Sequence, residues 1–587
     1  MIYSFLFVIL FFCLLFGIII YPQKKECVNV IQILPIKIVV ELCMLVIGAY
    51  IIQKFGIYVD IKSTSVFLLI VNLVVWYGVI KARKFQKLVW AWKDLIMLAS
   101  PTVLVIIEAY HMFSGSLRLS YLNDDAQTHF FWAMNIVRTG KLEGTFFNAY
   151  LNAILIELIE PFVKQVYYYK VFILSDIFMH ILEIEVFYAV VCSIFKKRNI
   201  TYLAPIICIM YFLGYPTFSF MRGNFVYWST GGILYLLVIY ILLNIEKNWK
   251  ERRSYWISLI ICLLGSILCN RLYAVINIVS VLSVYLLLWL SEENRGFTLI
   301  SKKVLISFVL ITVTLVFIFQ KKIIYVVQIF AGALSEEGYT YTSLYRQFIL
   351  FIPVLIFVFA SVYLKKKRKY LVCNLTVLLI CITIGMYRLY VNEMISGYYY
   401  YKIYYSLWIM VWLIVAMAVD VLYEERKLYL GGIYILGLIC FALSNSCEYK
   451  KIGFSDNVDY FSFYNANFQY FKMDYTSEEL AEKGRYISQQ ELDTYQYIQD
   501  HYKNQEVWFI SDAGNYMRGR WFAALLGQTN VTLYGEYVSY IENYLDTDNL
   551  YLLLAKKSWV YEEAKDVINI EGIVYEDNTF IMVKSNK

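Results

Sequence analysis

Two adjacent aspartates and a histidine are the residues of this chain best suited to do chemistry. Asp124, Asp125 and His129 lie in the stretch YLNDDAQTHFFWAMNIVRTG, residues 121–140. Paired carboxylates can hold Mg²⁺ or Mn²⁺, which bind such oxygens together with water and substrate phosphate. A carboxylate can also act as a general base toward a hydroxyl group. The alternative role is capping, because acidic residues stabilise the N-terminus of a helix.

The residues from Asp125 onward are predicted to form a short amphipathic helix on the outer membrane surface. Apolar residues recur there at helical spacing, at Phe130, Ala133, Met134 and Val137. Gly140 follows where a C-cap glycine is expected, and Asn123 or Asp124 would be the N-cap. Capping accounts for one aspartate. It does not account for the second, or for His129, which lies one turn from Asp125 on the same face.

The composition places this helix in a membrane protein. Of the 587 residues, 60% are hydrophobic and only 17% are charged, whereas soluble domains carry about 25% charged residues. The net charge of +7 does not indicate nucleic acid, because the basic residues gather in short runs beside the hydrophobic stretches. The 11 cysteines lack C-x-x-C spacing and predict neither a disulfide framework nor a zinc site.

We expect an α-helical polytopic membrane protein with about fourteen transmembrane helices. The predicted spans are 2–20, 37–53, 65–81, 93–112, 168–195, 201–220, 231–245, 255–269, 272–290, 303–319, 346–364, 370–388, 403–423 and 428–446. If these spans alternate in direction, the basic runs all fall on one side, as short cytoplasmic loops require. The basic runs are 81–87, 196–198, 247–253, 301–303, 365–369 and 424–427. The long apolar run from 255 to 290 must then break at Asn270 and Arg271.

This orientation predicts two domains in a protein of the plasma (inner) membrane. Residues 1–446 would form the multi-spanning domain, with the acidic motif in an external loop at 113–167. Residues 447–587 would form a small extracytoplasmic α/β domain, with a helix at 491–505 and strands at 507–511 and within 572–584. The segment SDAGNYMRGRW, residues 511–521, is assigned to packing or to acceptor binding.

The acidic pair and the helix after it resemble the first large external loop of the GT-C superfamily of membrane glycosyltransferases. The shared pattern is D-D-x-x-x-H-x-x-x-A-x-x-x-x-x-x-G after an early span, in a chain with many spans and an outer C-terminal domain. The loop usually follows the first span in that family, whereas further spans precede it here. The resemblance implies inverting transfer of a sugar from a polyprenyl-phosphate carrier to an extracytoplasmic acceptor glycan, lipid or protein. Asp124 or Asp125 would be the base or a ligand of Mg²⁺ or Mn²⁺, and His129 would orient that carboxylate or the donor.

A lipid-linked phosphate needs cations near the membrane surface. Cationic side chains at or near the outer ends of predicted spans are Arg222, Arg271, Arg388 and Lys402. Arg271 interrupts an apolar run, and Lys402 follows Tyr401 in a run of tyrosines that could stack on a sugar. The alternative for each cation is snorkelling, in which a long side chain only reaches the interface with the membrane lipid.

The span at 168–195 carries Asp176, His180 and Glu183 on one helical face. Such a stripe is expected to face a cavity or other helices, because lipid does not solvate charge. It would support the site or line an acceptor groove, and a proton relay is the alternative. A transporter or flippase of lipid-linked saccharide would use this stripe with Arg271 to couple ion movement, although the sequence shows no duplicated halves. A polysaccharide polymerase or ligase would also use outer-face arginines.

Overall fold

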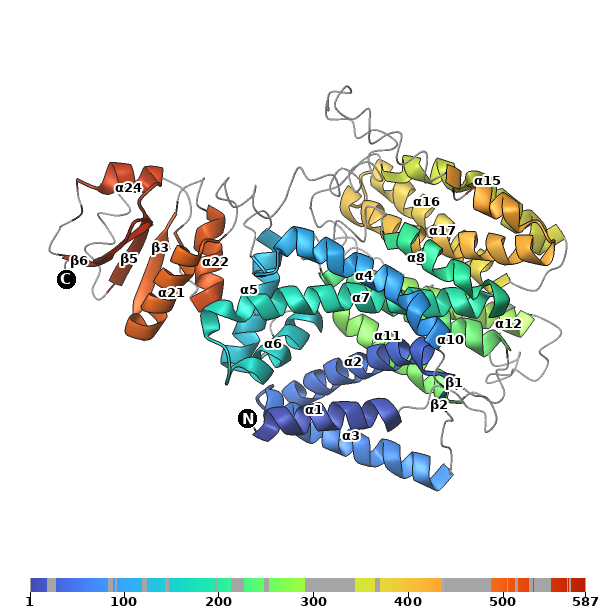
Figure 1. The fold of residues 1–587 in the computed structure, drawn as a ribbon, viewed down its shortest axis with the longest axis horizontal. Coiled ribbons are helices and arrows are strands. Elements are labelled where there is room, and N and C mark those ends of the chain that lie inside the picture. Colours follow the sequence, from blue (N-terminus) through green and yellow to red (C-terminus); the bar gives the residue numbers. More distant parts are fainter. Residues whose placement is uncertain are drawn as a thin grey trace, which may run out of the picture.

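The chain is mostly helical, with a small β-sheet near its C-terminal end (Figure 1). The computed structural model describes residues 2–17, 28–82, 88–89, 92–118, 124–142, 147–195, 198–212, 226–247, 253–290, 344–364, 370–434, 436–437, 487–503, 505–511, 516–526, 531–532, 550–566, 568 and 572–585. Asn123, Arg222 and the predicted span at 303–319 lie outside the described residues.

The helical bundle is built from the apolar stretches that the sequence marks as spans, together with two helices inside the predicted external loop. Its helices are α1 (Ile2–Gly17), α2 (Val30–Lys54), α3 (Ile61–Ala82), α4 (Trp92–Phe113), α5 (Asp124–Thr139), α6 (Phe147–Ile159), α7 (Tyr168–Ile194), α8 (Ala204–Phe212), α10 (Val226–Lys247), α11 (Arg253–Cys269), α12 (Arg271–Leu290), α15 (Ile352–Phe359), α16 (Tyr370–Val391) and α17 (Gly397–Glu424). Short 3₁₀ segments η1 (Gln165–Tyr167), η2 (Arg198–Leu203) and η5 (Leu344–Phe351) lead into α7, α8 and α15.

Among the described residues, five helical segments are long and apolar enough to cross a membrane. They are Val30–Lys54, Ile61–Lys81, Gln165–Ile194, Leu371–Val391 and Gly397–Glu424. Shorter apolar segments of 10–17 fully described residues lie in other helices, among them Ser229–Ile245 of α10 and Leu272–Leu286 of α12. A membrane-crossing bundle is therefore supported by length and composition, while the figure of about fourteen spans stays a prediction.

The expected break in the long apolar run lies between α11 and α12. α11 ends at Cys269 and α12 begins at Arg271, and the side-chain oxygen of Asn270 accepts a hydrogen bond from the Tyr273 backbone at 3.2 Å. Asn270 therefore caps the start of α12. Gly231 of α10 lies against this corner, since a Cβ there would come within 2.3 Å of the Tyr273 ring.

If the predicted spans alternate in direction, the link between α2 and α3 lies on the same side of the membrane as the loop that carries the acidic motif. In the structure these two segments are in contact. The Leu142 backbone and the Gln53 amide bond to each other in both directions, at 2.8 and 3.4 Å. The Val59 N–H donates to the Gly140 carbonyl at 2.9 Å. Away from these contacts, β1 (Val28–Asn29) and β2 (Leu88–Val89) pair in parallel (Figure 1). The link between α2 and α3 therefore joins the loop that carries the acidic motif.

Gly140 ends α5 as the sequence predicts. Its φ is +59°, the left-handed region that glycine adopts at helix C-termini, and its N–H donates to the Ile136 carbonyl at 2.7 Å. The Tyr58 hydroxyl donates to the Arg138 carbonyl at 2.9 Å, in the last turn, where helix carbonyls lack partners within the helix. The Tyr58 ring lies so close to Gly140 that a Cβ there would be 2.4 Å from it.

The C-terminal domain is a sheet with helices beside it. Its elements are α21 (Gln489–Tyr502), β3 (Glu506–Ile510), α22 (Tyr516–Leu526), β4 (Val531–Thr532), β5 (Leu550–Ala555), α24 (Trp559–Ala564), β6 (Ile573–Glu576) and β7 (Phe580–Lys584). The strand order is β4-β3-β5-β7-β6, with β3 parallel to β4 and β5 and with β7 antiparallel to its neighbours. The predicted helix and strands of this segment are present.

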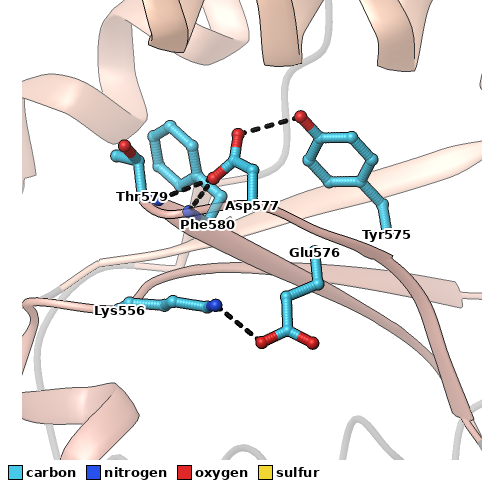
Figure 2. A network of polar contacts seen from close by, with 6 residues as sticks. All are labelled: Lys556, Tyr575, Glu576, Asp577, Thr579 and Phe580. Carbon is cyan, nitrogen blue, oxygen red and sulfur yellow. Dashed lines mark hydrogen bonds and ion pairs between the residues drawn. The ribbon is translucent and has the colours of Figure 1, made fainter.

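Asp577 organises the turn between β6 and β7 (Figure 2). One carboxylate oxygen accepts the backbone N–H groups of Thr579 and Phe580, each at 2.6 Å. The other accepts the hydroxyls of Tyr575 at 2.8 Å and Thr494 at 2.7 Å. Because Thr494 belongs to α21, this one side chain ties the turn to the helix. Nearby, Lys556 and Glu576 form an ion pair at 2.6 Å on the surface.

We predict that Gly140→Ala destabilises the protein by more than Gly56→Ala. Both glycines have positive φ, +59° and +71°, so alanine is strained by about 1 to 2 kcal/mol at either position. Only Gly140 adds a steric clash, because nothing lies within 4 Å of a Cβ at Gly56. Apparent unfolding temperatures in detergent, read by tryptophan fluorescence, measure the difference. Equal losses in the two variants would show that Tyr58 does not pack against Gly140.

Candidate active site

Asp124 and Asp125 form the first turn of α5. Their side chains, like residue Asn123, lie outside the described part of the chain. The backbone shows that α5 begins at Asp124 and that both acids stand at the end of the helix farthest from Gly140, while capping by Asn123 or Asp124 stays a prediction. The apolar face predicted from the sequence is present, since Phe130, Ala133 and Met134 are buried.

α5 differs from the predicted surface helix because its polar side is also covered. Gln127, His129 and Asn135 are at most 8% exposed. α6 packs against one side of α5, and α22 of the C-terminal domain packs against another (Figure 1). A helix lying on a membrane would leave these polar residues in water. The acid-bearing helix is instead enclosed between the bundle and the C-terminal domain.

His129 is held as a neutral imidazole. Its side chain is buried and meets the Trp132 ring edge-on, with the ring centroids 5.0 Å apart. Burial lowers the pKa of His129 to about 4, because charging the ring would remove an ion from water. The residue can therefore orient a neighbouring group by hydrogen bonding at neutral pH, but it does not add positive charge to the site.

The C-terminal domain supplies contacts to α5 that sequence reasoning did not assign. The Gln127 side chain donates to the Arg520 carbonyl at 3.1 Å, and the Arg520 guanidinium donates to the Thr128 hydroxyl at 2.8 Å. The Phe130 and Trp521 rings lie 5.7 Å apart. These residues of α22 fall in the segment expected to serve packing or acceptor binding, and the structure shows packing. No periodic signal links positions so far apart in the chain.

Of the predicted phosphate-binding cations, Lys402 has the best-defined surroundings. Its ammonium lies 5.0 Å from the centroid of the Tyr398 ring and 5.7 Å from that of Tyr405, which is cation–π geometry. Tyr401 is buried and packs against Tyr390. The tyrosines near Lys402 therefore form a packed aromatic cluster.

The other predicted cations are less informative. Arg388 is exposed near the end of α16. Arg271 begins α12, but its side chain lies outside the described residues, as does all of Arg222. The described contacts do not join Lys402 or Arg388 to α5. A common site for these cations and the acidic pair is therefore still a prediction.

The polar stripe of α7 is a buried cluster. One imidazole nitrogen of His180 lies 3.4 Å from an Asp176 oxygen, and the other lies 3.7 Å from a Glu183 oxygen. All three side chains are buried, so the expectation that they face other helices is met. Gly232 of α10 packs beside Glu183, since a Cβ there would lie 3.3 Å from the carboxylate.

Tyr211 of α8 is a member of this cluster that the sequence did not reveal. Its hydroxyl donates to the second Glu183 oxygen at 2.5 Å, and its carbonyl accepts the Trp408 indole N–H at 3.2 Å. Trp408 in turn stacks on Tyr404, whose ring meets that of Tyr405 in the aromatic cluster near Lys402. The acids of α7 are thus connected through α8 to α17. Nothing in the spacing distinguishes Tyr211 among 55 tyrosines.

Within the described residues, no group of three or more histidine, cysteine, aspartate or glutamate side chains is arranged to hold a metal ion. The side chains of Asp124 and Asp125 are not part of that set.

No protein-family model, curated protein or solved structure matches this chain. The function is therefore inferred from the residues and their geometry.

We predict that His129 makes the folded protein acid-sensitive. Its pKa is lowered from 6.5 in the unfolded chain to about 4 in the folded one, so the unfolded state binds more protons between these values. The stability associated with neutral His129 is complete above pH 6.5 and is lost as the pH falls toward 4. The expected loss between pH 7 and pH 5 is about 2 kcal/mol.

Unfolding of the detergent-solubilised protein at several pH values measures this slope. His129→Gln should flatten it, whereas His501→Gln, which changes an exposed residue of α21, should leave it intact. The same slope in wild type and His129→Gln would contradict the prediction.

Proposed function

We propose that this protein is an integral-membrane glycosyltransferase that moves a sugar from a polyprenyl-phosphate carrier to an extracytoplasmic acceptor. The position of Asp124 and Asp125 carries the proposal. They begin α5, which is enclosed between the helical bundle and the C-terminal domain. An acidic pair at such a junction can meet a lipid-borne donor from the bundle and an acceptor from the side of the domain.

The contacts around α5 support the proposed orientation. The link between α2 and α3, the acidic loop and the C-terminal domain all meet at this helix. The alternation of spans puts each of these segments outside the cytoplasm. We therefore place the C-terminal domain and the acidic pair on the outer face of the plasma membrane.

In the proposed reaction, one carboxylate of the pair removes the proton of an acceptor hydroxyl. The acceptor oxygen forms a bond to the anomeric carbon of the sugar while the bond from that carbon to the phosphate oxygen breaks with its electron pair. Attack opposite to the leaving group inverts the configuration. Lys402 and Arg271 would neutralise the departing polyprenyl phosphate. Mg²⁺ or Mn²⁺, if used, would be held by Asp124 and Asp125.

We predict that the double variant Asp124→Asn, Asp125→Asn loses transfer activity by at least about a hundredfold, because the amide cannot accept the proton. The protein in nanodiscs is assayed with radiolabelled short-chain polyprenyl-phosphate hexoses and pentoses and with membrane extracts as acceptors. Binding of the donor should change by less than roughly threefold.

Asp500→Asn is the matched control, since Asp500 is an exposed acid of α21. It should retain full transfer. A double variant as active as wild type would end the assignment of the acidic pair as the base.

The second candidate is a transporter or flippase of lipid-linked saccharide, which the buried cluster of Asp176, His180 and Glu183 favours. A transporter that couples ion movement to transport would need these groups to exchange protons. We predict that His180→Gln leaves transfer less affected than the double aspartate variant. Movement of a fluorescent lipid-linked saccharide across liposomes tests the alternative. A flippase would lose movement in His180→Gln and keep it in the double aspartate variant, the reverse of what we expect for transfer.

A further inference from the structure

The contact between α22 and α5 is built around Arg520. Its carbonyl accepts the Gln127 amide and its guanidinium donates to the Thr128 hydroxyl, so Arg520 binds α5 through both backbone and side chain. Next to it, Trp521 is fully buried against Phe130. Figure 1 shows α22 beside α5 where the C-terminal domain meets the bundle.

Thr128 is placed one turn from both acids. It follows Asp124 by four residues and Asp125 by three, so it lies between them around the helix. Arginine stays charged at every physiological pH. The bond to Thr128 therefore brings a permanent positive charge to the end of α5 where the acidic pair begins.

Other charged residues on α5 and on the helices that pack against it have contacts of their own. Arg518, also on α22, lies 3.2 Å from Glu491 of α21 and so acts within the C-terminal domain. Glu157 of α6 accepts the N–H of Ile61 at the start of α3. Arg138 belongs to the last turn of α5. Arg520 reaches the first turns of α5, where its guanidinium donates to the Thr128 hydroxyl.

The two ends of α5 are fixed by different parts of the protein. The C-terminal end is held by Tyr58 and Val59, which bond to the carbonyls of Arg138 and Gly140. The acid-bearing half is held by Arg520 and Trp521. The C-terminal domain also contacts η1, where Gln165 donates to the Leu525 carbonyl at 2.8 Å.

We propose that Arg520 is a positioning residue for the acidic pair, supplied by the C-terminal domain; this role rests on the proposed transfer function. Its bond to Thr128 fixes the first turns of α5, and its charge offsets the repulsion between the adjacent carboxylates. Arg520 acts through α5 and does not touch the reacting atoms. The C-terminal domain is then a part of the site.

Hydrogen exchange of the full-length protein in nanodiscs, read by mass spectrometry, tests the positioning without any substrate. Arg520→Met should speed exchange of the amides at 126–130 by roughly tenfold, because a charge-assisted hydrogen bond is lost. Arg520→Lys should show a smaller change. Lys556→Met removes a cation from the surface pair in Figure 2 and should leave α5 unchanged. Wild-type exchange at 126–130 in Arg520→Met would overturn the proposal.

Transfer kinetics with the short-chain polyprenyl-phosphate sugars test the link to the acidic pair. Arg520→Met should lower kcat by roughly ten- to a hundredfold with KM within about threefold, since misplaced groups slow the chemical step. Arg520→Lys should recover part of the rate. Gln127→Ala removes the bond to the Arg520 carbonyl and a bond from the Thr128 hydroxyl but keeps the Arg520 charge, so it should cost less.

Unchanged kcat in Arg520→Met, or equal losses in Arg520→Met and Gln127→Ala, would overturn this link. If Arg520→Met does not fold, Arg520→Lys against Gln127→Ala makes the same comparison. If wild type transfers none of the sugars, the proposed function fails, while the exchange result still decides whether Arg520 positions α5.

Discussion

Apolar helices make up most of the described chain, and several polar side chains buried among them have partners inside the protein. Ser65 bonds back to the carbonyl of Ile61 at 2.6 Å, one turn earlier in its own helix. Asn72 bonds to the Leu10 carbonyl at 2.9 Å and so joins α3 to α1. Glu183 is an ionisable group with partners in its own helix and in α8. Ionisable groups inside an apolar helical bundle are costly to bury, and they are therefore candidates for a functional role.

Elements with a strong local signal could be predicted from the sequence. Hydrophobic runs predict the helices of the bundle, because only a helix satisfies its own backbone in an apolar setting. Asn270 interrupts one such run and caps the next helix. Gly140 follows an apolar period and has the positive φ that a C-cap glycine adopts. In each case the chemistry that decides the structure lies within a few residues of the chain.

Features that depend on distant residues could not be predicted. The pairing of α22 with α5 joins residues 392 positions apart. The sequence of neither helix indicates which other helix it will pack against. Tyr211 could not be separated from the many other tyrosines until the fold placed it at Glu183. The neutral state of His129 follows from burial by the surrounding helices, which spacing along α5 does not reveal. The acidic pair was predicted from the sequence, whereas the packing of α22 against the helix that carries it was not.

The order in which the anchors of α5 are synthesised has a consequence for biogenesis. Tyr58 and Gln53 are synthesised before α5, so their contacts with the C-terminal end of that helix can form as soon as it has been made. Arg520 follows Thr128 by 392 residues, which at ~5–20 residues per second takes roughly 20 to 80 s. During that interval α5 lacks its contacts with α22, while α6 can already pack against it. The contact between α22 and α5 therefore forms last, after all the helices that precede α22 in the chain have been synthesised.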